Sequence, residues 1–74
     1  MMYAESTIII VDGFEVCEIL YQENGHGHGR AYRNNTTLYD GYDWEALKAY
    51  EAEVKRVVAI WQQSGRDMQI VKRH

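Results

Sequence analysis

Residues 44–63 carry apolar side chains at the spacing of one helical face. On a helix of about 3.6 residues per turn, these side chains form one stripe, and charged side chains lie opposite. The apolar stripe consists of Leu47, Tyr50, Val54, Val57, Val58 and Trp61. The opposite side consists of Glu45, Lys48, Glu53, Lys55, Arg56 and Gln62. One helix cannot cover its own stripe, so strands elsewhere in the chain must supply the facing wall.

The residues that flank this segment predict where the helix begins and ends. Asp43 is expected at the N-cap, where a carboxylate can accept backbone hydrogen bonds. Glu45 then lies in the first turn, at the positive end of the helix dipole. Ser64 and Gly65 predict the end of the helix, because glycine readily adopts the left-handed conformation found there.

Two strands joined by a tight turn are predicted before the helix. Residues 7–11 are β-branched throughout, and residues 14–21 form the return strand. Asp12-Gly13 between them is a dipeptide that two-residue type I′ turns favour. This register places Val11 opposite Phe14 and Ile9 opposite Val16. A bulge near Cys17-Glu18, or partial covering of the outer face, would explain the apolar residues on both faces.

The remaining segments complete an α+β fold. Residues 23–29 read as a glycine-rich loop, residues 30–33 as a third strand, and residues 36–42 as a connection with a short strand at 37–39. Residues 68–72 predict a last strand at an edge or beside the first. The expected fold is a three-stranded antiparallel meander, one amphipathic helix packed on one face and a short C-terminal strand (β-β-β-α-β). Residues 1–74 are predicted to form a single small domain.

Composition narrows the class of protein. The chain is 46% hydrophobic and 26% charged, as globular domains are, and its formal net charge is −3. This acidity disfavours non-specific nucleic-acid binding. Cys17 is the single cysteine, which favours a reducing cytoplasm. The apolar run at 8–11 is too short for a signal or membrane segment.

A cluster of aromatic and acidic residues precedes and begins the predicted helix. Aromatic side chains are favoured anchors in interfaces, and acids beside them suit a basic partner. The predicted partner-binding residues are Tyr39, Asp40, Tyr42, Asp43 and Glu45. The alternative is a packed connection in which Tyr42 contacts the first helical turn.

A basic and aromatic patch on the third strand supports a second hypothesis. Arg30, Tyr32 and Arg33 could bind nucleic acid through the sheet face. Three further cations could extend the patch if the last strand lies nearby. These are Arg66, Lys72 and Arg73. The acidic total, and the glutamates of the neighbouring strand, weigh against it.

Catalysis, a cofactor and a metal site are not predicted. His26 and His28 could bind a transition metal with Glu23 or His74, but two ligands on a glycine-rich loop fall short of a usual site. Cys17 lies among apolar neighbours in a strand, which is typical of a buried, unreactive thiol.

A homodimer is the remaining expectation about assembly. Ile60 lies on the otherwise polar side of the helix, together with three alanines. These small residues, which could form a flat helix-docking seam, are Ala49, Ala52 and Ala59.

The layout of the chain resembles small phage and bacterial domains. The residues that carry the resemblance are the hairpin at 11–16, the segment Gly29-Arg30-Ala31-Tyr32 and the helix that ends in Ser64-Gly65. The order of elements is similar to the N-terminal half of HicB-type antitoxins and to small anti-CRISPR proteins of phage. The latter resemblance implies an inhibitor that binds a protein complex, such as a CRISPR effector. An aspartate that a HicB-like domain would use has no clear counterpart here.

Overall fold

Three two-residue turns fold the first part of the chain into a meander. Each turn has positive φ at both central residues, as type I′ geometry requires. The pairs are Asp12 and Gly13 (φ 52° and 84°), His26 and Gly27 (φ 53° and 73°), and Asn34 and Asn35 (φ 49° and 68°). The turn at Asp12-Gly13 was predicted. The predicted glycine-rich loop at 23–29 is wrong, because Gly25 pairs with His28 and leaves only His26 and Gly27 in the turn.

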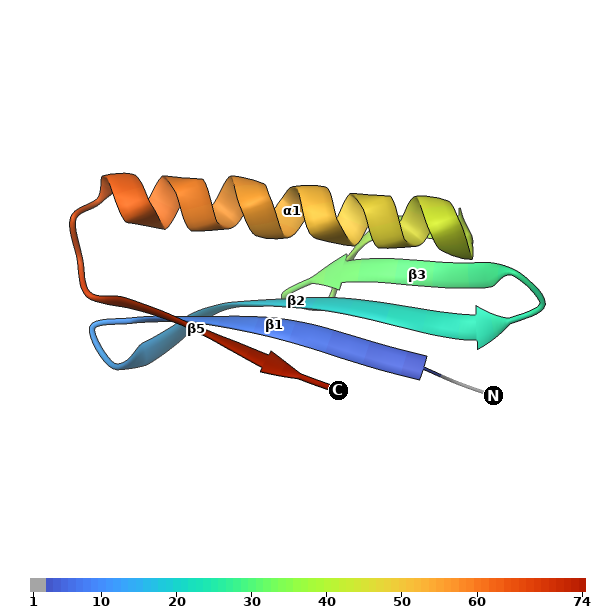
Figure 1. The fold of residues 1–74 in the computed structure, drawn as a ribbon, viewed down its shortest axis with the longest axis horizontal. Helices are drawn as coiled ribbons and strands as arrows, with labels where there is room; N and C mark the ends of the chain where they lie inside the picture. The colour runs from blue at the N-terminus through green and yellow to red at the C-terminus, as the bar shows by residue number, and fades with distance from the viewer. Residues whose placement is uncertain (1–2) are drawn as a thin grey trace.

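A computed structural model describes residues 3–74 (Figure 1). Its elements, in chain order, are β1 (Tyr3–Val11), β2 (Phe14–Gly25), β3 (His28–Arg33), β4 (Thr36–Tyr42), α1 (Asp43–Gln63) and β5 (Met68–Arg73). They form an elongated molecule of 41 × 18 × 16 Å, in which α1 runs along the sheet. The α+β class is therefore confirmed, with one long helix as predicted.

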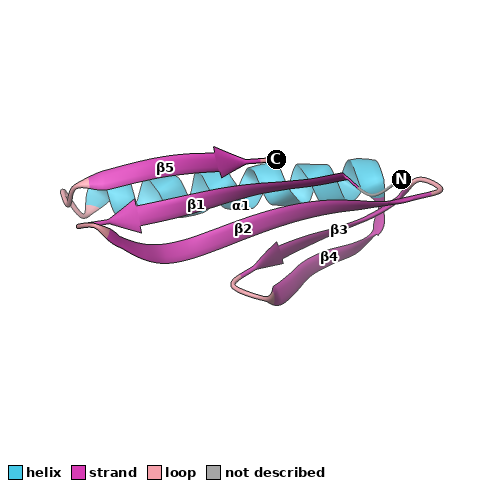
Figure 2. Ribbon diagram, turned by 90° about the horizontal axis from the view of Figure 1, so that it is seen from below, coloured by secondary structure: helices cyan, strands magenta, loops and turns pink. Residues whose placement is uncertain are grey.

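The sheet has five strands rather than the predicted three-stranded meander with a short addition. Its order is β4-β3-β2-β1-β5, and all neighbouring pairs are antiparallel. Residues 36–42 form one strand throughout, so the short strand predicted at 37–39 extends over the whole of the predicted connection. β5 lies beside β1 and forms one edge of the sheet, as predicted. Figure 2 views the sheet from the side that α1 leaves uncovered.

A bulge in β2 determines which residues face the helix. Ile10 lies opposite Glu15, whereas Ile9 lies opposite Cys17, so Val16 is the extra residue. The predicted pairing of Ile9 with Val16 is therefore wrong, and the bulge lies one residue before the predicted place. An extra residue reverses the alternation of faces beyond it. This reversal places the buried residues of β2, from Cys17 onward, on the same side of the sheet as Ile9.

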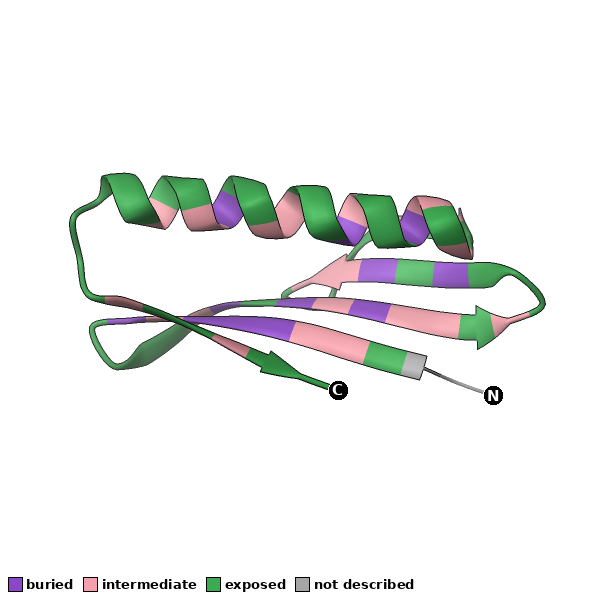
Figure 3. Ribbon diagram, in the orientation of Figure 1, coloured by how far each residue is buried: buried purple, intermediate pink, exposed green. Residues whose placement is uncertain are grey.

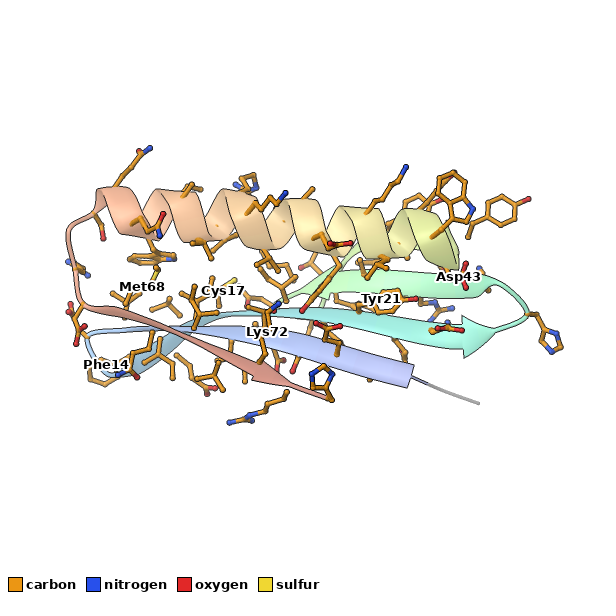
Figure 4. The ribbon with its side chains drawn as sticks, in the orientation of Figure 1. Phe14, Cys17, Tyr21, Asp43, Met68 and Lys72 are labelled. Carbon is orange, nitrogen blue, oxygen red and sulfur yellow. The ribbon has the colours of Figure 1, made fainter. Side chains whose placement is uncertain are left out.

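The core fills the space between α1 and the sheet (Figure 3). Its buried members are Ile9, Val11, Cys17, Ile19, Tyr21, Ala31, Ala46, Tyr50 and Val57. Thr7 is also buried, and its hydroxyl lies 2.5 Å from the Tyr50 hydroxyl. This hydrogen bond satisfies two polar groups that would otherwise be costly to bury. Tyr21 points from the sheet towards the helix (Figure 4).

The helix contacts the sheet through a face slightly rotated from the predicted one. Ala46, Tyr50 and Val57 are its buried residues, whereas Leu47 is exposed. The helix begins at Asp43, and Tyr42 holds the N-cap position without a side-chain cap. The prediction of Asp43 as N-cap is therefore wrong. Gly65 has φ 71°, which confirms the predicted left-handed residue after the helix.

Among residues 3–74, no helix combines the length and the apolar character that a membrane span requires.

Candidate partner-binding site

A hollow of about 370 Å³ lies where the β2–β3 turn, the end of β4 and the start of α1 meet. It is lined by His26, Gly27, His28, Tyr39, Gly41 and Tyr42. It is the largest of the hollows described between residues 3 and 74. We refer to this hollow, with the adjacent Asp43 and Glu45, as the helix-mouth site.

A backbone hydrogen bond and a close packing contact hold the start of α1 against the sheet. The Asp43 amide donates a hydrogen bond of 2.8 Å to the Gly27 carbonyl. Gly29 is buried beneath this turn, and a Cβ at Gly29 would lie 2.9 Å from the Asp43 Cα and 3.3 Å from the Ala46 Cβ. The absence of a side chain at Gly29 therefore allows the first helical turn to rest directly on β3.

Tyr39 links β4 to the helix through its hydroxyl. The Tyr39 hydroxyl donates a hydrogen bond to the Glu45 carboxylate. This hydrogen bond is the main reason that the pKa of Tyr39 is raised. Because Gly41 has no side chain, the ring of Tyr39 can lie over it; a Cβ there would come within 2.8 Å of the Tyr39 hydroxyl oxygen. Tyr39 thus forms a fixed wall of the hollow.

Asp40 points away from the helix, towards Arg30 and His28 on β3. Its Oδ2 lies 3.1 Å from Arg30 Nε, and its Oδ1 lies 3.2 Å from His28 Nε2. Arg30 and Asp40 lie directly opposite each other in the register of β3 and β4. The charge of Asp40 is therefore largely compensated within the chain.

The exposed groups of the site are aromatic and acidic. Tyr42 is 67% exposed, and Trp44 is 55% exposed with the Lys48 Nζ 4.9 Å from the centre of its ring. No ion pair to Asp43 is found within residues 3–74. Glu23 lies opposite Gly29 in the register, and Gly29 contacts Asp43, so a second carboxylate belongs to this end of the molecule.

The five predicted partner-binding residues thus divide by role. Tyr42 and Asp43 are available at the helix-mouth site, Tyr39 and Glu45 bind each other, and Asp40 is paired on the outer face of the sheet. The prediction did not include the two histidines that line the hollow. No motif in the sequence pointed to them, because they reach the hollow only through the pairing of β3 with β4.

The predicted nucleic-acid patch is split between the two faces of the sheet. Arg30 donates a hydrogen bond of 3.5 Å to the Tyr32 hydroxyl on the uncovered face. This bond is the leading cause of the raised pKa of Arg30. Arg33 lies on the helix side, where its Nη1 is 3.0 Å from Glu53.

The three cations expected to extend this patch lie elsewhere. β5, which carries Lys72 and Arg73, is separated from β3 by both β1 and β2. Arg66 lies near the turn between β1 and β2, where its Nε is 3.8 Å from Asp12 Oδ2. The condition for extending the basic patch, a last strand close to the third, is therefore not met.

The candidate residues for metal binding and catalysis are not clustered in the structure. Within residues 3–74, no group of three or more histidine, cysteine, aspartate or glutamate side chains could hold a metal ion. Cys17 is buried, and burial is the main cause of its raised pKa. Figure 4 shows Cys17 between the helix and the sheet, far along the molecule from Asp43.

The uncovered sheet face carries two open hollows of about 190 and 210 Å³. They share Glu18 and Asn34, and the side chains around them include Ile8, Glu15, Leu20 and Tyr32. Asn34 is fixed there, because its side-chain oxygen accepts a hydrogen bond of 2.9 Å from the Glu18 amide. This face is therefore mixed in character, with acids beside apolar groups.

Comparison with known protein families, with curated proteins and with solved structures gives no significant match. The interpretation of the helix-mouth site therefore depends on its residues and their geometry.

Proposed function

We propose that this protein is a non-enzymatic inhibitor that binds a basic, nucleic-acid-binding surface of a protein complex. The observation that carries the proposal is the helix-mouth site, a hollow between tyrosines with carboxylates beside it. An arginine or lysine of the partner fits this chemistry, because a cation is attracted both to an aromatic face and to a carboxylate. The net charge of −3 supports the same choice of partner.

The exposed aromatic groups supply the anchors for such an interface. Tyr42 and Trp44 flank the start of α1 and bury large area at low cost in side-chain entropy. A cation stacked on one ring contributes about 0.5–2 kcal/mol. Asp43 and Glu23 would speed the encounter with a basic surface, since complementary charge raises association rates more than final affinity.

Inhibition follows from occupation of the basic surface. A partner whose arginines and lysines contact this protein cannot offer the same groups to nucleic acid. This mode of action is that of an anti-CRISPR-like protein, and a CRISPR effector is a partner of the required chemistry. This proposal is supported by the resemblance of the order of elements to small anti-CRISPR proteins, and by the acidic and aromatic residues of the helix-mouth site.

Charge reversal at Asp43 tests the proposal. The probe is a short fluorescent peptide of alternating arginine and glycine, and the measurement is its anisotropy at about 0.15 M ionic strength, where the Debye length is about 8 Å. Asp43→Lys is expected to weaken binding about tenfold, because it replaces attraction by repulsion beside the hollow. Glu51→Lys is the matched control, since Glu51 is exposed and lies two helical turns from Asp43.

The control should change affinity by less than about twofold, because salt screens charges beyond about one Debye length. Circular dichroism must show that both variants keep the wild-type helix content. Equal losses in the two variants would mean that only net charge matters, and absence of peptide binding by the wild type would refute the proposal.

A nucleic-acid-binding or HicB-like module is the second candidate, because Arg30 and Tyr32 lie side by side on the uncovered sheet face. A gel-shift titration distinguishes it from the first. Retardation of duplex DNA at about 50 µM protein and about 50 mM salt, abolished by Arg30→Ala, would favour this candidate. The inhibitor proposal predicts no retardation.

A further inference from the structure

The two edges of the sheet differ in regularity. β4 contains a bulge at Leu38, because Ala31 lies opposite Tyr39 while Tyr32 lies opposite Thr37. β5 pairs with β1 through six consecutive residues without a shift. Bulged edges resist pairing with a further strand, whereas a regular edge is a template for it. The available edge is therefore β5.

The helix leaves this edge uncovered. α1 packs over β2, β3 and β4 and only slightly over β1. Ile70, on the helix side of β5, is 45% exposed. A hollow of about 140 Å³ separates the helix from β5 and is lined in part by Val54 and Lys72. In Figure 4, Lys72 points from β5 into the space beneath α1.

The two ends of β5 carry side chains of opposite charge. Asp67 precedes the strand and Arg73 ends it, and neither has an ion-pair partner within residues 3–74. In an antiparallel pair of identical strands, the start of one strand lies beside the end of the other. An aspartate at the start and an arginine at the end therefore attract each other twice.

We propose that β5 pairs with β5 of a second copy of this chain, in antiparallel register centred on Ile70. In an antiparallel pair, residues that lie opposite each other point to the same face of the sheet, whereas neighbours along one strand point to opposite faces. The two-fold axis that relates two copies of β5 must therefore pass between one residue and its own copy. Ile70 at the centre places Asp67 opposite Arg73 and Met68 opposite Lys72. Val71 at the centre would instead oppose Ile70 with Lys72 and Gln69 with Arg73, so neither charge would meet an opposite charge.

This pairing joins two five-stranded sheets into one sheet of ten strands. The two-fold axis is perpendicular to the sheet, so both helices lie on the same face and the two helix-mouth sites lie at opposite ends. The interface uses the same strand twice and is therefore closed, which limits assembly to a dimer. It does not depend on the function proposed above.

A charge exchange tests the dimer and its register together. The mass of the wild type is measured by sedimentation equilibrium between about 10 µM and about 1 mM. We expect a species of twice the 8.7 kDa chain mass. Arg73→Asp should raise the dimer dissociation constant at least about tenfold, since it places two acids opposite each other twice. The double variant Asp67→Arg with Arg73→Asp should restore the dimer.

Lys48→Asp is the matched control, because it makes the same charge change on an exposed helix residue away from β5. Its dissociation constant should stay within about twofold of the wild type. A monomer at every concentration, assembly beyond a dimer, or failure of the exchanged variant to recover would each overturn the proposal. The three residues changed, Asp67, Arg73 and Lys48, are all exposed in the wild type, and thermal unfolding verifies that each variant folds.

Discussion

At the scale of single residues, Gly29 determines whether the helix-mouth site can form. It is buried under the first turn of α1, and Asp43 and Ala46 occupy the space that a side chain would need. Two backbones can approach this closely only where one residue lacks a Cβ. The same residue lies beside the acidic groups of the site, so its effect extends to binding.

Gly29→Ala is expected to lower the free energy of unfolding by about 1–3 kcal/mol, because the new Cβ must displace the helix backbone. Urea unfolding followed by circular dichroism measures this loss. Gly27→Asn is the control: its surroundings are open, and asparagine tolerates the positive φ of 73° better than other residues do. Equal stability of Gly29→Ala and the wild type would contradict the close packing of α1 on β3.

At the scale of elements, strong local patterns were predictable and weak ones were not. The helix was evident from its apolar spacing, and the first turn from Asp12-Gly13. β4 was predicted only in part, as a short strand at 37–39, because it is an edge strand with mostly exposed residues and a faint alternation of apolar and polar positions. Its glycine and its bulge further obscure that alternation.

The helix is also tied to β3 by a carboxylate that sequence alone did not connect to it. Glu53, whose side chain is 11% exposed, receives two hydrogen bonds from Arg56 and lies 3.0 Å from Arg33 of β3. The prediction had placed Glu53 on the polar side of the helix, whereas it lies at the border of the buried face. The hydrogen bonds from Arg56 are the main reason that its pKa is lowered.

A lowered pKa in the folded state stabilises the protein at pH values above the ordinary carboxyl range, and this contribution disappears as pH falls through the lowered pKa. Glu53→Gln should therefore be less stable than the wild type by about 1 kcal/mol at pH 7. The two should become equal below about pH 3. Urea unfolding at several pH values measures the difference, with Glu51→Gln as a control. A constant difference at all pH values would contradict the ion-pair account.

At the scale of the whole molecule, the fold separates two surfaces. The helix-mouth site occupies one end of the elongated chain, where the β2–β3 turn and the start of α1 meet (Figure 1). The β5 edge runs along one side (Figure 2). The sequence indicated acidic and aromatic residues near the helix start. It could not indicate the hollow, because His26 and His28 reach it only through pairing of β3 with β4.

The most direct test of the central claim is the location of binding. Amide chemical shifts of ¹⁵N-labelled protein are followed by NMR while the unlabelled arginine-glycine peptide is added. A partner held in the helix-mouth site should produce the largest shifts at residues 26–28 and 39–45, with small shifts along the uncovered sheet face. Largest shifts at Glu15, Glu18 and their neighbours on that face, or no localised shifts, would contradict the claim.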